Sequence, residues 1–127
     1  MIFEIDESKN EPIYKQIQQQ IILAIAQQDI FPGDNLPSIR QLSDELSINP
    51  MTISKAYSLL KEDGYLQTDR RKGAIITRPD TFTDATKKRY LENLALVIAD
   101  GFLHHEENDQ IIADVKKILT QYEKESE

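Results

Sequence analysis

The 127-residue sequence contains no cysteine and no tryptophan, and aromatic residues make up only 7% of it. Without cysteine there is no disulfide framework, thiolate zinc site or cysteine nucleophile, which fits the reducing cytoplasm. With so few aromatic residues, a hydrophobic core has to be built mainly from isoleucine and leucine. Disulfide-rich secreted domains and thiol enzymes are therefore excluded.

Long hydrophobic runs are also missing. The apolar-rich stretches are interrupted by Gln, Asp or Gly well before the roughly 18 residues that a membrane span requires. The N-terminal sequence MIFEIDESKNEP has no basic segment followed by an apolar run, so we expect no signal peptide. These features predict a cytoplasmic protein that does not associate with membranes.

Catalytic motifs are absent as well. We find no glycine-rich phosphate loop, no Ser/His/Asp set and no metal-ligand spacing. The two histidines, His104 and His105, are adjacent, so their side chains would point to different faces of a helix and chelate one ion poorly. We predict a protein that is not an enzyme and that uses no cofactor or metal.

Net positive charge is lacking, which at first argues against nucleic acid, because binding to a duplex depends on neutralising phosphates. The formal net charge of −7 is, however, unevenly distributed. Residues 36–78 hold seven basic and five acidic side chains, a local charge of +2. A locally basic module on an acidic chain is compatible with DNA binding over a modest footprint.

The first half of the chain has the apolar spacing of three helices. Pro12 stands at the expected first position of the first helix, which runs to a turn at 32–35. A Ser38–Gln41 capping box predicts a short second helix, and Asn49 followed by Pro50 predicts the start of the third. The expected buried positions are Ile13, Ile17, Ile21, Ala24 and Ile25, then Ile39, Leu42 and Leu46, then Ile53, Ala56, Tyr57 and Leu60.

A change of pattern after the third helix predicts a β-hairpin. Gly64 supplies a left-handed helix stop, and residues 65–68 and 74–77 have the composition of strands. The turn between them, 69–73, contains three consecutive cations. Two short helices joined by a tight turn place the second one for insertion into a major groove. A basic hairpin tip can follow the backbone or enter a minor groove.

The C-terminal region has two more amphipathic helices, separated by a polar break at 104–109. Two helices alone cannot bury wide apolar faces, so a monomer would expose an apolar patch. Pairing with a second copy in a closed two-fold dimer removes that patch. The predicted dimer interface consists of Leu91, Leu94, Ile98, Phe102, Ile111, Ile112, Val115, Ile118, Leu119 and Tyr122.

The predicted fold is thus mainly α with a small β-hairpin. A winged helix-turn-helix DNA-binding domain is expected at 1–78, and a helical dimerisation element, which is also where an effector would act, at 79–127. Whether a small molecule regulates the protein is left open.

Residues 12–76 closely resemble the N-terminal domain of GntR-type transcription regulators. The matching stretches are PIYKQI at 12–17, PGDNLPSIRQL at 32–42, NPMTISKAY at 49–57 and the wing ending KGAII at 72–76. The NPMTISKAY run and the short two-helix tail resemble the YtrA subfamily in particular. This resemblance implies repression of a nearby transporter operon by a homodimer that pairs through its tail.

The resemblance also implies roles for individual residues. Arg40 matches an arginine that contacts DNA at the start of the short helix. Thr52, Ser54 and Lys55 match recognition-helix positions that touch bases or phosphates, and Gly73 matches the wing glycine. The expected DNA contacts are Ser38, Arg40, Asn49, Met51, Thr52, Ser54, Lys55, Arg70, Arg71, Lys72 and Gly73.

The chain departs from the family pattern at three positions. Many relatives have arginine where this chain has Pro50 and Ser54, and the wing glycine expected before Lys72 is Arg71 here. The base preference of better-known relatives is therefore not transferable. Direct reading of bases by the third helix is expected to be weaker, and the wing is expected to contribute a larger share of DNA binding.

Other interpretations stand beside these. Arg40 can instead pair with Asp44 at i,i+4, the three wing cations can belong to a solvated loop, and Tyr57 can be a stacking platform instead of a core residue. The leading function is a sequence-specific transcription regulator, a repressor that binds a two-fold symmetric operator as a homodimer. The alternative, which the acidic net charge favours, is a winged helix that binds a partner protein without reading DNA.

Overall fold

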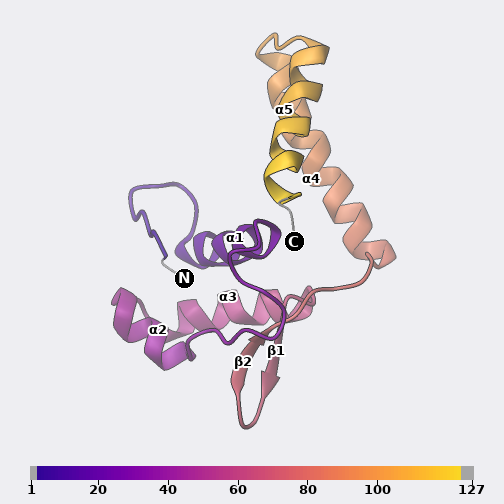
Figure 1. Cartoon of the computed structure of the whole chain (residues 1–127). Helices are drawn as coiled ribbons and strands as arrows, with labels where there is room; N and C mark the ends of the chain where they lie inside the picture. Colours follow the sequence, from indigo (N-terminus) through magenta and orange to yellow (C-terminus); the bar gives the residue numbers. More distant parts are fainter. Residues whose placement is uncertain (1–2, 124–127) are drawn as a thin grey trace. The chain divides into compact units, whose positions relative to one another are not determined.

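The computed structural model describes residues 3–123, and the chain divides after Pro79 into two compact units. Three helices and a hairpin form the first unit, and two helices form the second (Figure 1). The elements are α1 (Ile13–Ala26), α2 (Ile39–Leu46), α3 (Pro50–Glu62), β1 (Leu66–Asp69), β2 (Gly73–Ile76), α4 (Asp84–Leu103) and α5 (Asn108–Tyr122). The predicted fold class, mainly helical with a small hairpin, is confirmed.

Helix α1 contains the whole predicted apolar pattern, Ile13 to Ile25, but ends earlier than predicted. Pro12 is the N-cap and not the first helical residue, and the helix ends at Ala26 instead of reaching the turn at 32–35. The end is set by Gln28, whose φ of 62° lies in the left-handed region. The amide of Asp29 then donates to the carbonyl of Ala24 at 2.8 Å, which satisfies one of the last helical acceptors.

The N-termini of α2 and α3 have the predicted caps. The Ser38 hydroxyl accepts a hydrogen bond from the Gln41 amide at 3.0 Å, and the Gln41 side chain accepts one from the Ser38 amide at 2.8 Å. Asn49 caps α3 by accepting from the Met51 amide at 2.8 Å. Ser47, with a φ of 53°, makes the sharp turn between the two helices. Local side-chain chemistry therefore fixes the start of each helix of the pair.

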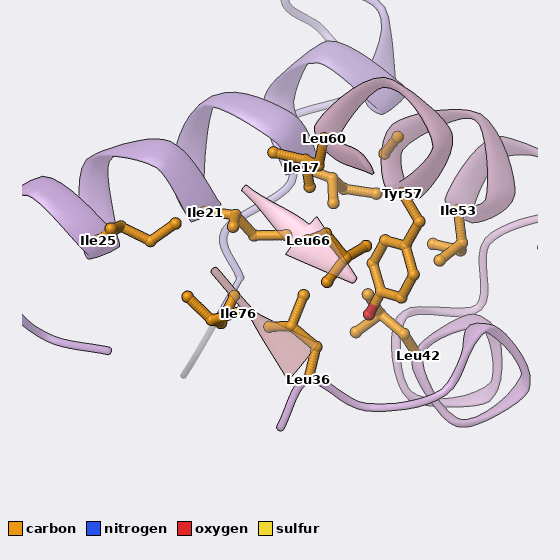
Figure 2. Packing of buried hydrophobic residues seen from close by; sticks show 11 residues of the cluster. Ile17, Ile21, Ile25, Leu36, Leu42, Ile53, Tyr57, Leu60, Leu66 and Ile76 are labelled. Carbon is orange, nitrogen blue, oxygen red and sulfur yellow. The ribbon is translucent and has the colours of Figure 1, made fainter. Parts of the chain in front are cut away.

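The core of the first unit is aliphatic around one tyrosine. Figure 2 shows the Tyr57 ring among Leu42, Ile53 and Leu66, so the core interpretation of Tyr57 is confirmed. Its side chain is largely buried, and burial raises the pKa of the phenol well above its ordinary value. The fully buried large side chains are Ile17, Ile21, Leu42, Ile53, Leu60 and Ile76.

One predicted core position is wrong. Ile39 is 36% exposed, because it is the first residue of a two-turn helix and lies beside the cap, whereas Leu42 one turn later is fully buried. Ile13 and Leu46 are only half-buried, although both pack against the core.

The N-terminal segment is ordered by two glutamines of α1, a feature the sequence pattern did not predict. The Gln20 amide pairs with the backbone of Glu4, donating at 2.6 Å and accepting at 2.9 Å. One turn earlier, the buried Gln16 exchanges the same pair of bonds with Asp6, both at 2.9 Å. These amides provide the backbone partners that a neighbouring strand would otherwise supply.

The hairpin is antiparallel, with Leu66 opposite Ile76 and Asp69 opposite Gly73. Both strands are displaced by one residue from the predicted ranges. The preceding segment, 33–36, bonds to the outer edge of β2: the Leu36 amide donates to Ala74 and the Ile76 amide donates to Asp34. The wing is therefore joined to the body of the unit along one edge.

The second unit is a helical hairpin whose apolar side chains remain exposed. α4 begins with a Thr83–Thr86 capping box, and α5 begins at Asn108, so the predicted break at 104–109 is two residues shorter. No side chain of α4 or α5 is fully buried within the described part of this unit. Among residues 3–123, no helix is both long and apolar enough to cross a membrane.

Candidate nucleic-acid interface

The outward face of α3 holds small, polar and cationic side chains. Met51 is 79% exposed and Lys55 is exposed, whereas Thr52 and Ser54 are half-buried. The opposite face of the helix, with Ile53, Ala56, Tyr57 and Leu60, is buried in the core. The four residues therefore lie on the solvent side of α3, which also exposes Ser58. A helix with this segregation has the size and chemistry to enter a major groove.

Lys55 is held against the first helix. Its ammonium nitrogen lies 4.1 Å from the centroid of the Tyr14 ring, within the range of a cation–π interaction. Among residues 3–123, no carboxylate lies within ion-pair distance of Lys55. The cation is therefore positioned by a neutral ring and keeps its full charge for another partner.

Arg40 is exposed in the first turn of α2. The alternative pairing with Asp44 is not formed, since no ion pair joins the two in the described range 3–123. The nearby Ser38 and Asn49 use their side-chain oxygens as helix caps, which gives both residues a structural role whether or not they also contact DNA.

Tyr57 connects the two helices of the pair to the chain before them. Its hydroxyl donates to the carbonyl of Pro37 at 2.7 Å, just ahead of the cap of α2. The bond fixes the start of α2, and so Arg40, relative to α3. A core residue of α3 therefore positions the start of α2, which carries Arg40.

The wing tip is a tight turn organised by Asp69. Its carboxylate accepts hydrogen bonds from the backbone amides of Arg71 at 2.7 Å and Lys72 at 3.1 Å. These bonds hold the pKa of Asp69 below its ordinary value, so the turn is fully supported at neutral pH and loses this support as pH falls through that lowered pKa. The Arg70, Arg71 and Lys72 side chains all remain exposed, and Gly73 takes a φ of 83°.

Asn35 joins the wing to the body of the unit, a role that sequence reasoning did not assign. Its side-chain amide donates to the carbonyls of Lys72 and Ala74. The signal was present in the turn-forming PGDN run, but a turn alone does not reveal which distant backbone it meets. Asn35 thus sets the position of the wing cations from outside the hairpin.

Replacing Asn35 with Ala is expected to lower the free energy of unfolding by about 0.5–1 kcal/mol, because two exposed hydrogen bonds are removed. Amide hydrogen exchange at Leu36 and Ile76, whose amides join segment 33–36 to β2, should accelerate at the same time. Urea denaturation and exchange by NMR measure the two effects. Gln67→Ala, an exposed change on β1 without a side-chain hydrogen bond among the described residues, is the control. A midpoint unchanged by Asn35→Ala would show that the contact does not hold the wing.

The loop between α4 and α5 contains the two histidines. His104 Nδ1 lies 2.7 Å from the carbonyl oxygen of Asp100, and His105 adopts a φ of 64°. Within residues 3–123, no group of three or more histidine or acidic side chains is placed to hold a metal ion.

Comparisons with known proteins agree with this geometry. Residues 13–76 match the family model described as bacterial regulatory proteins, gntR family. The HTH-type transcriptional repressor YtrA of Bacillus subtilis is 34% identical over 124 residues, covering 91% of this chain and 95% of that protein. The uncharacterized HTH-type transcriptional regulator YhcF of the same organism is 32% identical over 94 residues and covers 74% of each chain.

Two solved structures share the fold over nearly the whole chain. A transcriptional antiterminator from Listeria monocytogenes superposes with a TM-score of 0.81 at 26% identity, covering 94% of this chain and 93% of that one. YtrA from Sulfolobus acidocaldarius, a GntR-family transcription factor, gives a TM-score of 0.56 at 30% identity, with 93% and 97% covered.

Proposed function

Because the chain belongs to the GntR family of DNA-binding transcriptional regulators, we propose that it is a repressor that binds a two-fold symmetric operator as a homodimer. The observation that supports this most is the presence, in one unit, of an exposed α3 face, an exposed Arg40 and a basic wing. By resemblance, the regulated genes are those of a nearby transporter operon.

In this proposal α3 lies in the major groove. Met51, Thr52 and Ser54 approach base edges, and Lys55 bonds a phosphate. Arg40 at the start of α2 holds a second phosphate, and the wing cations follow the backbone or enter the adjacent minor groove. Phosphate contacts fix the register, so only the three small or flexible side chains of α3 are left to read sequence.

The dimer is formed by the tail. α4 and α5 expose a set of large apolar side chains that includes Phe102 at 65%, Ile112 at 52% and Leu119 at 50%. Burying such a face against an identical one is favourable at about 25 cal/mol per Å² of apolar surface. Isologous pairing places two reading units on one duplex, and their separation has to match half-sites about one helical turn apart. An effector would act at this seam by changing that separation.

The test is fluorescence anisotropy with a labelled duplex from upstream of the protein's own gene, titrated across salt against a scrambled duplex. We expect the upstream duplex to bind about a thousandfold more tightly, a ratio typical of specific sites. Equal weak binding to both duplexes would contradict the proposal and favour a winged helix that binds a partner protein.

Replacing Arg40 with Ala is expected to weaken operator binding by about 1–3 kcal/mol, because a charge-assisted hydrogen bond to the DNA is removed. The same titration measures the effect. Lys61→Ala removes an equal charge from the last turn of α3 and should bind as the wild type does. If Arg40→Ala folds normally and binds equally well, the Arg40 assignment is wrong.

A further inference from the structure

We propose that Tyr14, which lies outside the helix pair and the wing, is a positioning residue for DNA binding that holds the Lys55 ammonium ready for a phosphate. The inference rests on the proposed function, since it assigns a second residue to the Lys55 contact. Its basis is the placement of the Lys55 ammonium 4.1 Å from the Tyr14 ring centroid.

The ring is itself held firmly. Tyr14 is half-buried and packs against the core of the first unit, on a helix fixed by the fully buried Ile17 and Ile21. A free lysine side chain samples many rotamers, and binding has to suppress them. A ring that already occupies the correct place removes part of that cost before DNA arrives, which is preorganisation.

The Lys55 ammonium is positioned by an aromatic ring and not by a carboxylate, and this difference affects phosphate binding. A carboxylate partner would compete with a phosphate for the ammonium, whereas a neutral aromatic face attracts the cation and leaves its charge and donors free. Among residues 3–123, no acidic side chain pairs with Lys55. Tyr14 therefore orders the cation without neutralising it, as a phosphate contact requires.

The salt dependence of DNA binding distinguishes loss of the Tyr14 ring from loss of the Lys55 ammonium. Removing the ring should lower affinity while the number of phosphate contacts stays the same, so the slope of log K against log salt should not change. Removing the ammonium should lower affinity and also reduce that slope by about 0.9. Tyr14→Leu, Lys55→Met, the double variant and the matched control Tyr14→Phe separate the two effects.

The experiment measures anisotropy with a duplex selected by the wild-type protein from a random library, at salt concentrations between about 50 and 200 mM. We expect Tyr14→Leu to bind about two- to fivefold more weakly at an unaltered slope, the fold-change that an exposed cation–π contact corresponds to. Tyr14→Phe should bind as the wild type does, and Tyr14→Leu should add nothing to Lys55→Met. Tyr14→Leu binding that equals or exceeds the wild type, or additive effects, would overturn the proposal.

A measurement on the free protein keeps the test valid if Tyr14→Leu does not fold. The ring current of Tyr14 should shift the Lys55 ε-methylene protons upfield in the wild type and in Tyr14→Phe, and unshifted protons would overturn the inference. The Lys55→Met arm identifies which idea has failed. If Lys55→Met binds DNA as tightly as the wild type, the proposed contact between Lys55 and DNA is refuted. If Lys55→Met binds more weakly but Tyr14→Leu binds as the wild type does, only the role of Tyr14 is refuted.

Discussion

Replacing Leu119 with Asp is expected to convert the protein from a dimer to a monomer and to weaken operator binding by about a hundredfold or more. The side chain is 50% exposed on α5, within the apolar set proposed as the interface. An aspartate there in each copy would bury two unpaired carboxylates in an apolar interface, which costs several kcal/mol. Losing the second reading unit then removes the avidity of two linked half-sites, worth about 10²–10⁴ in affinity.

Sedimentation equilibrium and operator anisotropy on the same samples test both parts. Gln121→Asp is a matched control, because it adds the same charge two residues away on α5 at an exposed polar position. The control should remain dimeric and bind normally. A Leu119→Asp protein that is still a dimer would place the interface elsewhere. One that is monomeric yet binds with full affinity would show that a single unit suffices.

The helix pair is largely predictable from sequence because its signals are local. Ser38 with Gln41 and Asn49 with Pro50 are capping patterns written within four residues, and each forms the expected hydrogen bonds. The apolar period of α3 likewise predicts its buried face. Such features need no knowledge of the remainder of the chain.

The contacts that position the candidate site are not local, and for this reason the sequence did not predict them. Asn35 donates to a carbonyl 37 residues further along, and Tyr14 meets Lys55 only because α1 packs on α3. Gln16, to which the apolar pattern assigned no role, is buried against the N-terminal backbone. Periodicity identifies which face of a helix is buried but not which side chain of another element it meets.

The departures from the family pattern and the geometry agree on how DNA binding is shared between α3 and the wing. Ser54, one of the departures, is half-buried on α3. The wing, by contrast, presents three exposed cations on a turn held by Asp69 and Asn35. Affinity from charge is therefore expected to be concentrated in the wing, while discrimination between bases depends on few contacts.

Replacing Arg70, Arg71 and Lys72 together with Ala should accordingly produce the largest loss of salt-dependent affinity of any change in the first unit. The slope of log K against log salt falls by about 0.9 for each phosphate that the protein no longer neutralises, which is just under a tenfold decrease in affinity at about 0.1 M salt. Three such phosphates would amount to between two and three decades. The turn itself should survive, because Asp69 is bonded to backbone amides of the tip and not to the side chains that are removed.

Anisotropy across salt measures the slope, and the chain offers a close control. Lys87, Lys88 and Arg89 form a second run of three exposed cations on α4, outside the wing. Changing these to Ala removes the same charge, so it reveals how much of the effect comes from net charge alone. A slope unaltered by the wing variant would show that the wing does not touch DNA. Equal decreases in both variants would mean that the phosphates respond to the overall charge of the protein, while a decrease confined to the wing variant would identify the tip as the point of contact.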